Sequence, residues 1–147
     1  MFSASSEDYS FTFDALPADH PLVDAWHSAL RTHRGGPALF DEITGGASIA
    51  DYLSDGSHQN EHIIIRSNTS DIGFALLRYG VLLALFVTPA LRRRGIASAF
   101  IVALRASGVE VVDARALPGD RGTKSLFESL GWKARLLTMR DGPLSEK

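Results

Sequence analysis

The 147-residue chain contains no cysteine. A disulfide framework, a thiolate metal site and a cysteine nucleophile are therefore excluded, and the absence fits a reducing compartment. Long apolar runs are also absent, because the longest, Val81–Val87, is far shorter than the ~20 residues of a membrane-spanning helix. The first residues do not read as a signal peptide. We expect a cytoplasmic protein that does not associate with a membrane.

Positive charge is scarce in one half of the sequence. Residues 1–70 carry three arginines and no lysine against ten acidic residues, a net charge of −7, whereas residues 71–147 carry twelve basic and seven acidic residues, a net charge of +5. Such a separation predicts that one part of the fold meets an anion and that another part meets a cation.

Strand and helix signals alternate along the chain, and no linker or repeat interrupts them. Residues 81–116 form a strand-helix-strand unit, which requires two parallel strands and a right-handed crossover. We therefore expect one domain over residues 1–147, of the α/β class or of the α+β class with a mixed sheet. The predicted strands are 9–16, 61–66, 72–79, 81–87, 109–116 and 132–140; the predicted helices are 21–34, 38–54 with a break at Gly45-Gly46, 92–106 and 121–130.

The stretch VTPALRRRGIAS, residues 87–98, links a buried strand to a helix. A helix N-terminus presents unpaired backbone N–H groups and the positive end of the helix dipole. Glycine at position 95 lets a bulky anion approach the backbone, and Ala97 keeps the next turn narrow. Arginines 92–94 add attraction and bidentate phosphate contacts. The pattern predicts a phosphate site.

The spacing V-x-P-x-x-R-x-x-G-x-A resembles the acyl-CoA pyrophosphate signature of the GNAT superfamily of N-acetyltransferases. A second stretch, residues 127–132 (FESLGW), looks like the Y-x-x-x-G-F segment of that family, with Asp120 seven residues upstream where an Asn often stands. The resemblance is specific over residues 81–132 and only topological over residues 1–80.

The resemblance implies a GNAT-like fold with a splayed, mixed central sheet and about four helices. Strands 81–87 and 109–116 would separate to admit pantetheine, and a backbone N–H near Phe86 or Val87 would stabilise the oxyanion. It implies transfer of an acetyl or other acyl group from acetyl-CoA to a primary amine of a small molecule or peptide. The implied cofactor-binding residues are Leu85, Phe86, Val87, Arg92, Arg93, Arg94, Gly95, Ile96, Ala97, Ser98, Asp120 and Phe127.

The chain departs from the family pattern at the groups that move protons. Phe127 stands where many members have the tyrosine that protonates the thiolate, and strand 81–87 has no acid. Asp113, on the strand beside the cleft, is the candidate general base, although an outward-facing surface carboxylate would look the same. The alternative to an enzyme is a non-catalytic acyl-CoA-binding or regulatory protein of the same fold.

Other motifs predict less. Residues 58–62 match H-x-x-E-H, but they follow a turn and run into a strand rather than a helix, so we predict no metal site; His62 or Glu61 could instead face the acceptor. The pI near 6.2 argues against nucleic acid. The acidic first half predicts a cationic acceptor amine. With one terminal strand where the family often has two, either the sheet ends early or a second copy completes its edge as a homodimer.

Overall fold

The computed structural model describes residues 3–6, 9–68 and 70–139. Six strands form one sheet in the order β1-β2-β3-β4-β5-β6. Neighbouring strands are antiparallel except for the last pair, β5 and β6, which is parallel. The strands are β1 Ser3–Ser6, β2 Tyr9–Phe13, β3 His62–Ser67, β4 Ser70–Arg78, β5 Val81–Val87 and β6 Asp113–Ala114.

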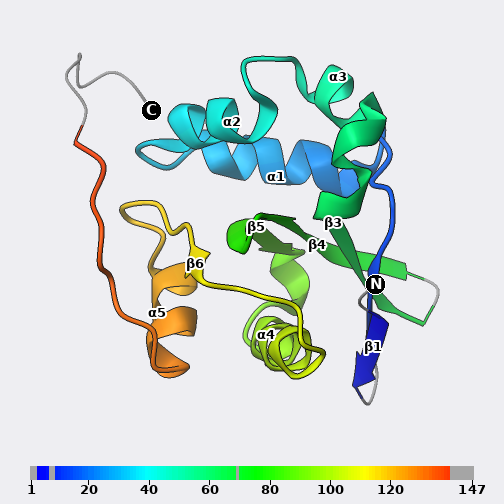
Figure 1. Cartoon of the computed structure of the whole chain (residues 1–147), viewed down its shortest axis with the longest axis vertical. Coiled ribbons are helices and arrows are strands. Elements are labelled where there is room, and N and C mark those ends of the chain that lie inside the picture. The colour runs from blue at the N-terminus through cyan, green and yellow to red at the C-terminus, as the bar shows by residue number, and fades with distance from the viewer. Residues whose placement is uncertain (1–2, 7–8, 69, 140–147) are drawn as a thin grey trace.

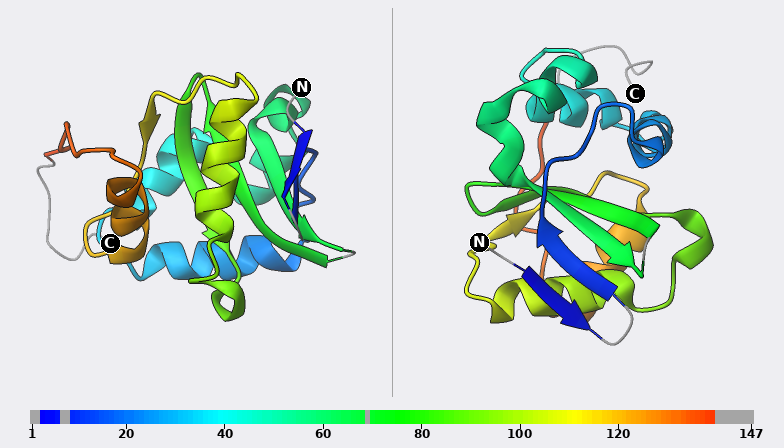
Figure 2. Two further views of the ribbon diagram at one scale, coloured as in Figure 1. Left: turned by 90° about the horizontal axis from the view of Figure 1, so that it is seen from below. Right: turned by 90° about the vertical axis from the view of Figure 1, so that its right-hand side faces the viewer.

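Helices cover both faces of the sheet (Figure 1). Three of them, α1 to α3, lie over one face, and α4 and α5 lie over the other (Figures 1 and 2). The helices are α1 Pro21–Arg31, α2 Gly36–Thr44, α3 Ile49–Ser54, α4 Ile96–Ala106 and α5 Arg121–Ser129, with 3-10 turns η1 Gly56–Glu61 and η2 Pro89–Leu91. No helix in the described ranges has the length and apolar character needed to cross a membrane.

The apolar strand β5 separates two hydrophobic cores. Leu82 and Val87 belong to the core under α4 and α5, while Leu83 and Phe86 belong to the core under α1 to α3. A strand buried on both faces has no reason to alternate polar with apolar residues. The uninterrupted run VLLALFV is thereby explained, and its predicted bounds are those observed.

Local sequence signals account for most helix boundaries. Helix α1 begins after His20, whose Nδ1 accepts a hydrogen bond from the Leu22 N–H at 3.1 Å, and Pro21 occupies its first position. Trp26 is buried between the helix and the sheet, with its ring 5.6 Å from that of Phe74. This places α1 against β4, as its apolar spacing predicts.

Several predicted elements are wrong in extent. The helix expected from residue 92 begins at Ile96, and Glu61, expected to begin a strand, ends the 3-10 turn Gly56–Glu61. The strand expected over 9–16 ends at Phe13, and the helix expected over 38–54 is divided into α2 and α3. The strand expected over 109–116 is reduced to Asp113–Ala114, and 132–139 are not a strand; Arg140, the last residue of that prediction, lies outside the described residues. β1 was not anticipated, because its sequence SASS has no large apolar, aromatic or β-branched residue.

Candidate active site

The sheet opens between β5 and β6. The two strands pair only at Val81 with Asp113 and at Leu82 with Ala114, and the last backbone bond joins the Arg115 N–H to the Leu82 oxygen at 2.9 Å. Leu83 is a bulge, since Leu82 pairs with Leu77 and Ala84 with Leu76. A bulge bends the strand that carries it. Here β5 turns away from β6 directly after their last pair, which is the predicted splay.

Backbone hydrogen bonding shows which groups of β5 face this gap. The Thr88 N–H donates to the Ile72 oxygen at 2.9 Å, and the Val87 oxygen accepts instead from the Arg92 side chain. Successive residues of a strand direct their backbone groups to opposite sides. The backbone of Leu85 and Val87 therefore faces the gap, and that of Phe86 faces β4. Of the two N–H groups predicted for the oxyanion, the one at Val87 has the required direction.

The start of α4 has an unusual backbone. Arg93 has φ 66° and Gly95 has φ 77°, both in the left-handed region. A Cβ added at Gly95 would meet no atom within 4 Å, so the space in front of the glycine is open. No side chain caps the helix, and the N–H groups of its first turn are left for a partner from outside. Buried Ile96 anchors this turn in the core.

Two further residues complete the first turn of α4, namely Ala97 and Ser98, which are half-buried. Both follow the open space at Gly95 directly. The predicted phosphate site thus consists of exposed backbone on a fixed helix end, which is the arrangement that binds anions at helix N-termini.

The three arginines take two different roles. Arg92 turns back onto β5: its Nε donates to the Val87 oxygen at 2.9 Å, and its guanidinium carbon lies 5.3 Å from the centre of the Phe86 ring. Its two terminal nitrogens have no hydrogen-bond partner in the described part of the chain. Arg93 and Arg94 are exposed. The triplet therefore holds the turn against β5 and places positive charge in front of α4.

Asp120 and Phe127 have structural partners. The Asp120 carboxylate caps α5, accepting from the Thr123 N–H at 3.2 Å and from the Thr123 hydroxyl at 2.7 Å. Phe127 is 7% exposed, and its ring lies 4.9 Å from that of Trp132. Both residues shape α5, which covers the sheet beside the gap. Phe127 carries no group that can give a proton.

Asp113 is exposed and lies at the closed end of the gap. It pairs with Val81, the first residue of β5, whereas the predicted phosphate site at residues 92–98, here called the cradle, follows the last residue, Val87. At a rise of about 3.3 Å per residue, the two ends of β5 are roughly 20 Å apart. A carboxylate at Asp113 is thus far from the phosphate site.

An ion pair that the sequence did not suggest lies beside β6. Arg115, directly after β6, donates to both oxygens of the Glu42 carboxylate, from Nε at 3.2 Å and from Nη2 at 2.9 Å. The pair joins α2 to the segment that leaves the sheet. The hydrogen bond from Arg115 lowers the pKa of the Glu42 carboxyl group. Partial burial acts in the opposite direction but is the smaller effect. No local sequence pattern predicts a contact between residues so far apart in the chain.

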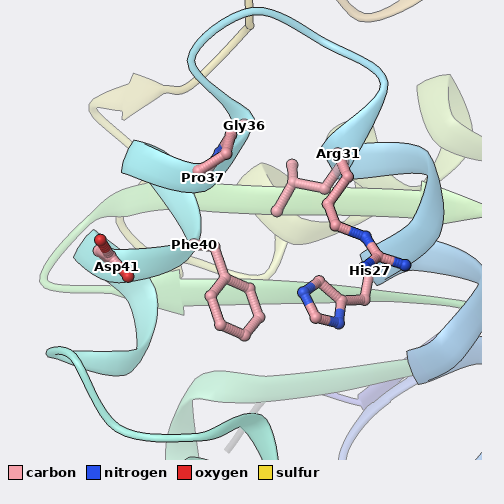
Figure 3. A pocket seen from close by; sticks show the side chains of 7 residues that line it. His27, Arg31, Gly36, Pro37, Phe40 and Asp41 are labelled. Atoms are coloured by element: carbon pink, nitrogen blue, oxygen red, sulfur yellow. The ribbon is translucent and has the colours of Figure 1, made fainter. Parts of the chain in front are cut away.

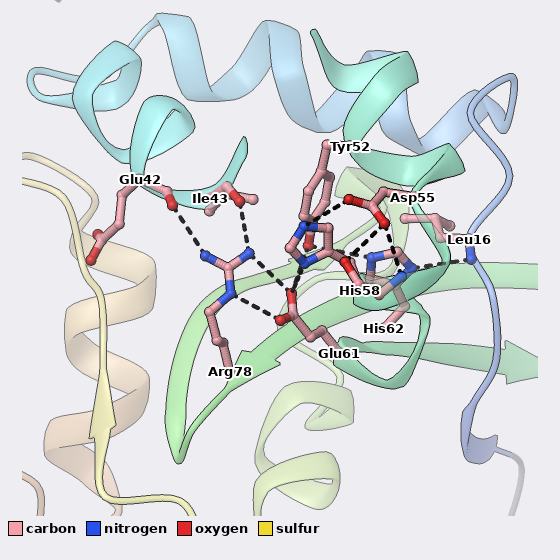
Figure 4. Close-up of polar contacts among 10 residues, drawn as sticks. Leu16, Glu42, Ile43, Tyr52, Asp55, His58, Glu61, His62 and Arg78 are labelled. Atoms are coloured by element: carbon pink, nitrogen blue, oxygen red, sulfur yellow. Dashed lines mark hydrogen bonds and ion pairs between the residues drawn. The ribbon is translucent and has the colours of Figure 1, made fainter. Parts of the chain in front are cut away.

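The H-x-x-E-H stretch belongs to a partly buried polar cluster that includes Tyr52 of α3 and Arg78 of β4 (Figure 4). Glu61 accepts two hydrogen bonds from Arg78, each 3.0 Å long, and a third from the Tyr52 hydroxyl at 3.2 Å. His62 accepts at Nδ1 from the Leu16 N–H at 3.4 Å, and its Nε2 lies 3.3 Å from the Tyr52 oxygen. These contacts tie α3 and the 3-10 turn to the sheet.

Burial and hydrogen bonding in this cluster shift the pKa values of His62, Glu61 and Tyr52. His62 is 1% exposed, and burial lowers its pKa to about 4, so the ring is neutral. Burial alone would raise the pKa of Glu61, but the hydrogen bonds and charge of Arg78 lower it. Burial also raises the pKa of Tyr52. His62 is buried and cannot face an acceptor, so that half of the expectation is wrong. Glu61 is partly exposed, and its carboxylate is already bound to Arg78 and Tyr52. No group of three or more His, Asp or Glu residues suited to a metal ion occurs within the described ranges.

Several acids of the first half are already paired with arginine. Glu42 binds Arg115 and Glu61 binds Arg78. The remaining example is Asp14, whose carboxylate lies 2.9 Å from Arg66. Others are exposed and have no ion pair within the described residues: Asp19, Asp24, Asp41 and Asp51.

A small pocket of about 120 Å³ lies between α1 and α2 (Figure 3). Its centre is a stacked pair, His27 and Phe40, whose rings are 4.4 Å apart and nearly parallel. Burial, and secondarily the charge of Arg31, lower the pKa of His27. The pocket is much smaller than an ordinary ligand site, and we assign it no role.

No family model and no curated protein matches the chain. Solved structures do. An aminoglycoside N-acetyltransferase, AAC(6')-Iy, in complex with CoA aligns with a TM-score of 0.53 and 18% identity over 96% of this chain and 97% of that one. A possible acetyltransferase from Clostridium difficile 630 aligns with a TM-score of 0.52 and 12% identity over 94% and 99%. Together with the splayed sheet, these likenesses show the fold predicted from residues 81–132.

Proposed function

We propose that this chain, which has the GNAT acetyltransferase fold, transfers an acetyl group from acetyl-CoA to a primary amine. The observation that carries the proposal is the open helix end at Gly95. It lies directly after the strand whose backbone edge is freed at the splay. Fold alone does not imply function, and the neighbour in complex with CoA supports the ligand only by analogy.

The residues present fit CoA. Its pyrophosphate needs donors and positive charge, which the N–H groups of Gly95 to Ser98 and the terminal nitrogens of Arg92 provide. Arg93 and Arg94 add long-range attraction. A side chain at position 95 would occupy the space that the anion needs, and the glycine leaves it empty. Acetyl-CoA would supply the thioester that the amine attacks.

The chain's own contribution is position and polarity. The N–H groups of Leu85 and Val87 face the gap, where one of them can donate to an extended ligand and the other to the oxygen that gains negative charge. Such a prearranged donor contributes about 3–4 kcal/mol in enzymes where it has been removed. Holding the amine beside the thioester supplies a further share.

Proton transfer is the least equipped part of the site. We keep Asp113 as the candidate base, because it is the acid of β6 and is exposed beside the gap. It lies roughly 20 Å along β5 from the N–H of Val87, so it would have to accept the proton of the amine through a chain of water molecules. A buried Phe127 in place of a tyrosine leaves the thiolate to be protonated by solvent.

A second function follows from that weakness. A protein that binds acyl-CoA without turning it over would keep the cradle and would need no acid. The buried, hydroxyl-free Phe127 favours this reading. The two functions share one binding site and differ only in turnover.

For the acceptor we propose a cationic small-molecule amine, such as a polyamine or an aminoglycoside, or a lysine-bearing peptide. The support is the charge of residues 1–70 and the four exposed acids that have no arginine partner among the described residues. Attraction of this kind raises the rate of encounter rather than the affinity of contact.

The test is thiol release from acetyl-CoA, followed across a panel of amines, together with CoA binding by calorimetry. Release that requires both protein and amine supports the enzyme. Binding without release for every amine supports the acyl-CoA-binding protein. Absence of binding contradicts both.

A further inference from the structure

The ion pair between Glu42 and Arg115 lies on the face of the sheet opposite to the cradle. Helix α2, which carries Glu42, and helix α4, whose N-terminus belongs to the cradle, cover different faces (Figures 1 and 2). Arg115 follows β6, and its N–H makes the last backbone bond to β5, at the Leu82 oxygen. In Figure 4 the Glu42 carboxylate points away from Arg78 and towards β6. The pair therefore lies where the sheet opens, on the side away from the predicted phosphate site.

This ion pair can be exchanged with little loss of stability. The side chains of Glu42 and Arg115 are 44% and 37% exposed, and neither side chain has another hydrogen-bond partner within the described residues. An ion pair with this degree of exposure contributes little to the stability of a fold. A charged group of a ligand can therefore take the place of either partner.

The neighbouring charges decide which partner a ligand replaces. The nearby cation Arg78 is already bound by Glu61, through two hydrogen bonds of 3.0 Å, so Glu42 without Arg115 would leave a negative charge in excess. Arg115 has a second anion beside it: the hydrogen bond to Glu42 raises the pKa of Arg115 most, and the charge of Asp113 raises it further. The pair therefore favours a cation in place of Arg115 over an anion in place of Glu42.

The distance from this pair to the predicted oxyanion donors sets the size of the ligand. The pair is attached to the sheet at Leu82, whereas the N–H groups that face the gap belong to Leu85 and Val87. At about 3.3 Å per residue, these points are roughly 10–16 Å apart along β5. An ammonium group bound at Glu42 is thus separate from the amine that attacks the thioester. One molecule can supply both only if it carries two amines on a chain of that length.

We propose that Glu42 binds a second, non-reacting ammonium group of a linear acceptor, in place of the Arg115 guanidinium. The inference rests on the proposed function. To the cationic acceptor proposed there it adds a binding residue, a length and a group that the acceptor must displace. Glu42 would lower the KM of such an acceptor, and Arg115 would raise it. A purely structural role of the pair predicts instead that removing either partner has the same effect, because both variants break one contact.

Binding is measured first, because it does not require turnover. Diaminodecane, whose nitrogens are roughly 12–13 Å apart when the chain is extended, is titrated into isotopically labelled protein, and the Arg115 Nε–H and the backbone amides are followed by NMR. We expect the dissociation constant to rise about 10-fold in Glu42→Gln and to fall about 5-fold in Arg115→Gln. Glutarate, titrated in the same way, tests for an anion on Arg115.

Two variants that remove the same charges elsewhere are the matched controls. Asp41→Asn removes an exposed carboxylate from the neighbouring position of α2, and Arg66→Gln removes the cation of the similarly exposed pair with Asp14. Because distant charges are screened at physiological salt, both should change the dissociation constant less than about 2-fold. Circular dichroism of every variant checks that the fold is retained, which we expect in Glu42→Gln because glutamine still accepts a hydrogen bond from Arg115.

Turnover then separates this inference from the proposed function. Acetyl transfer to diaminodecane is compared with transfer to aminodecanol, which has one charge, and to diaminobutane, whose nitrogens are roughly 6 Å apart. We expect diaminodecane to have the highest kcat/KM, and Glu42→Gln to remove this advantage through KM. If all three amines react alike and Glu42→Gln leaves their KM values unchanged, the proposed function stands and this inference is wrong.

The binding data decide the remaining cases. Binding of diaminodecane with opposite effects of Glu42→Gln and Arg115→Gln, but without transfer, would support the site at Glu42 and contradict the proposed enzyme. The proposal would be overturned if diaminodecane did not bind, if the two variants changed its binding in the same direction, if Asp41→Asn matched Glu42→Gln, or if glutarate bound in preference.

Discussion

Replacing Gly95 by aspartate and, in parallel, by asparagine separates the charge of the α4 N-terminus from its backbone. Gly95 has φ 77°, a conformation that costs a residue with a Cβ about 1–2 kcal/mol and that Asn and Asp tolerate best. Neither side chain meets an atom of the folded chain within 4 Å of the Cβ. Both variants are therefore expected to fold with a similar, small loss of stability.

The two variants should differ in binding CoA. A carboxylate about 4 Å from a phosphate charge is repelled by about 1 kcal/mol in water and about 4 kcal/mol at the effective dielectric of a protein surface. CoA should thus bind Gly95→Asp roughly 5-fold to 1,000-fold more weakly than it binds Gly95→Asn. Asparagine adds only bulk, so its own loss relative to the glycine measures the space that the ligand uses.

The assay is isothermal titration calorimetry with CoA, with melting temperatures recorded for both variants. The comparison is repeated at high salt, where the difference between the variants should shrink because the interaction is screened. Equal affinities of Asn and Asp variants, with both as stable as each other, would show that no phosphate lies near position 95 and would refute the reasoning.

Three further outcomes follow from the structure. Val87→Pro removes an N–H that faces the gap and should lower kcat about 100- to 1,000-fold with the fold retained, whereas Phe86→Pro removes a hydrogen bond to β4 and should unfold the protein. Equal effects of the two variants in steady-state kinetics and circular dichroism would contradict the conclusion that Val87 faces the gap and Phe86 faces β4. The pKa of His62 is about 4 in the folded chain, against 6.5 in the unfolded chain. Its neutral form therefore contributes about 3 kcal/mol to the free energy of unfolding, complete above pH 6.5 and lost as the pH falls towards 4. Urea unfolding of His62→Asn should lack this pH dependence, and a variant with the pH profile of the unmodified protein would refute the role of His62. A cationic amine should lose kcat/KM as salt rises, since the Debye length falls from ~30 Å at 0.01 M to ~8 Å at 0.15 M, and a matched anionic amine that reacts faster would show that the acids of residues 1–70 are only solvated surface.

Sequence reasoning succeeded where one local cause dominates. The run of β5 is apolar because both of its faces are buried, and no other element could use it. An open helix start near Gly95 was predicted because a glycine precedes an apolar helical run there, and the structure has it; the binding of phosphate at this helix end stays a prediction. Trp26 is buried because Leu22, Trp26 and Leu30 recur at helical spacing on one face of α1.

Sequence reasoning failed where the structure of a segment depends on a partner segment distant in the chain. Residues 109–112 (VEVV) resemble a strand, but Asp113 pairs with Val81, the first residue of β5, so these residues precede the β5 pairing and have no parallel partner. Beyond Leu82 the bulge at Leu83 turns β5 away, which leaves only two residues of β6 paired. Residues 132–139 likewise have strand character but pair with no strand in the described part of the chain. The helix expected from Arg92 starts later because Arg93 and Gly95 take left-handed conformations. The Glu42–Arg115 pair needed the fold itself to be known.

The central claim is that CoA binds at the N-terminus of α4 and along the gap-facing edge of β5. The most direct measurement is to add CoA to isotopically labelled protein and follow backbone amide resonances by NMR. The account predicts one site per chain and the largest shifts at Gly95, Ala97, Ser98, Leu85 and Val87, with His27 and Phe40 unchanged. Saturable shifts confined to the α1–α2 pocket, or no shifts at all, would contradict it.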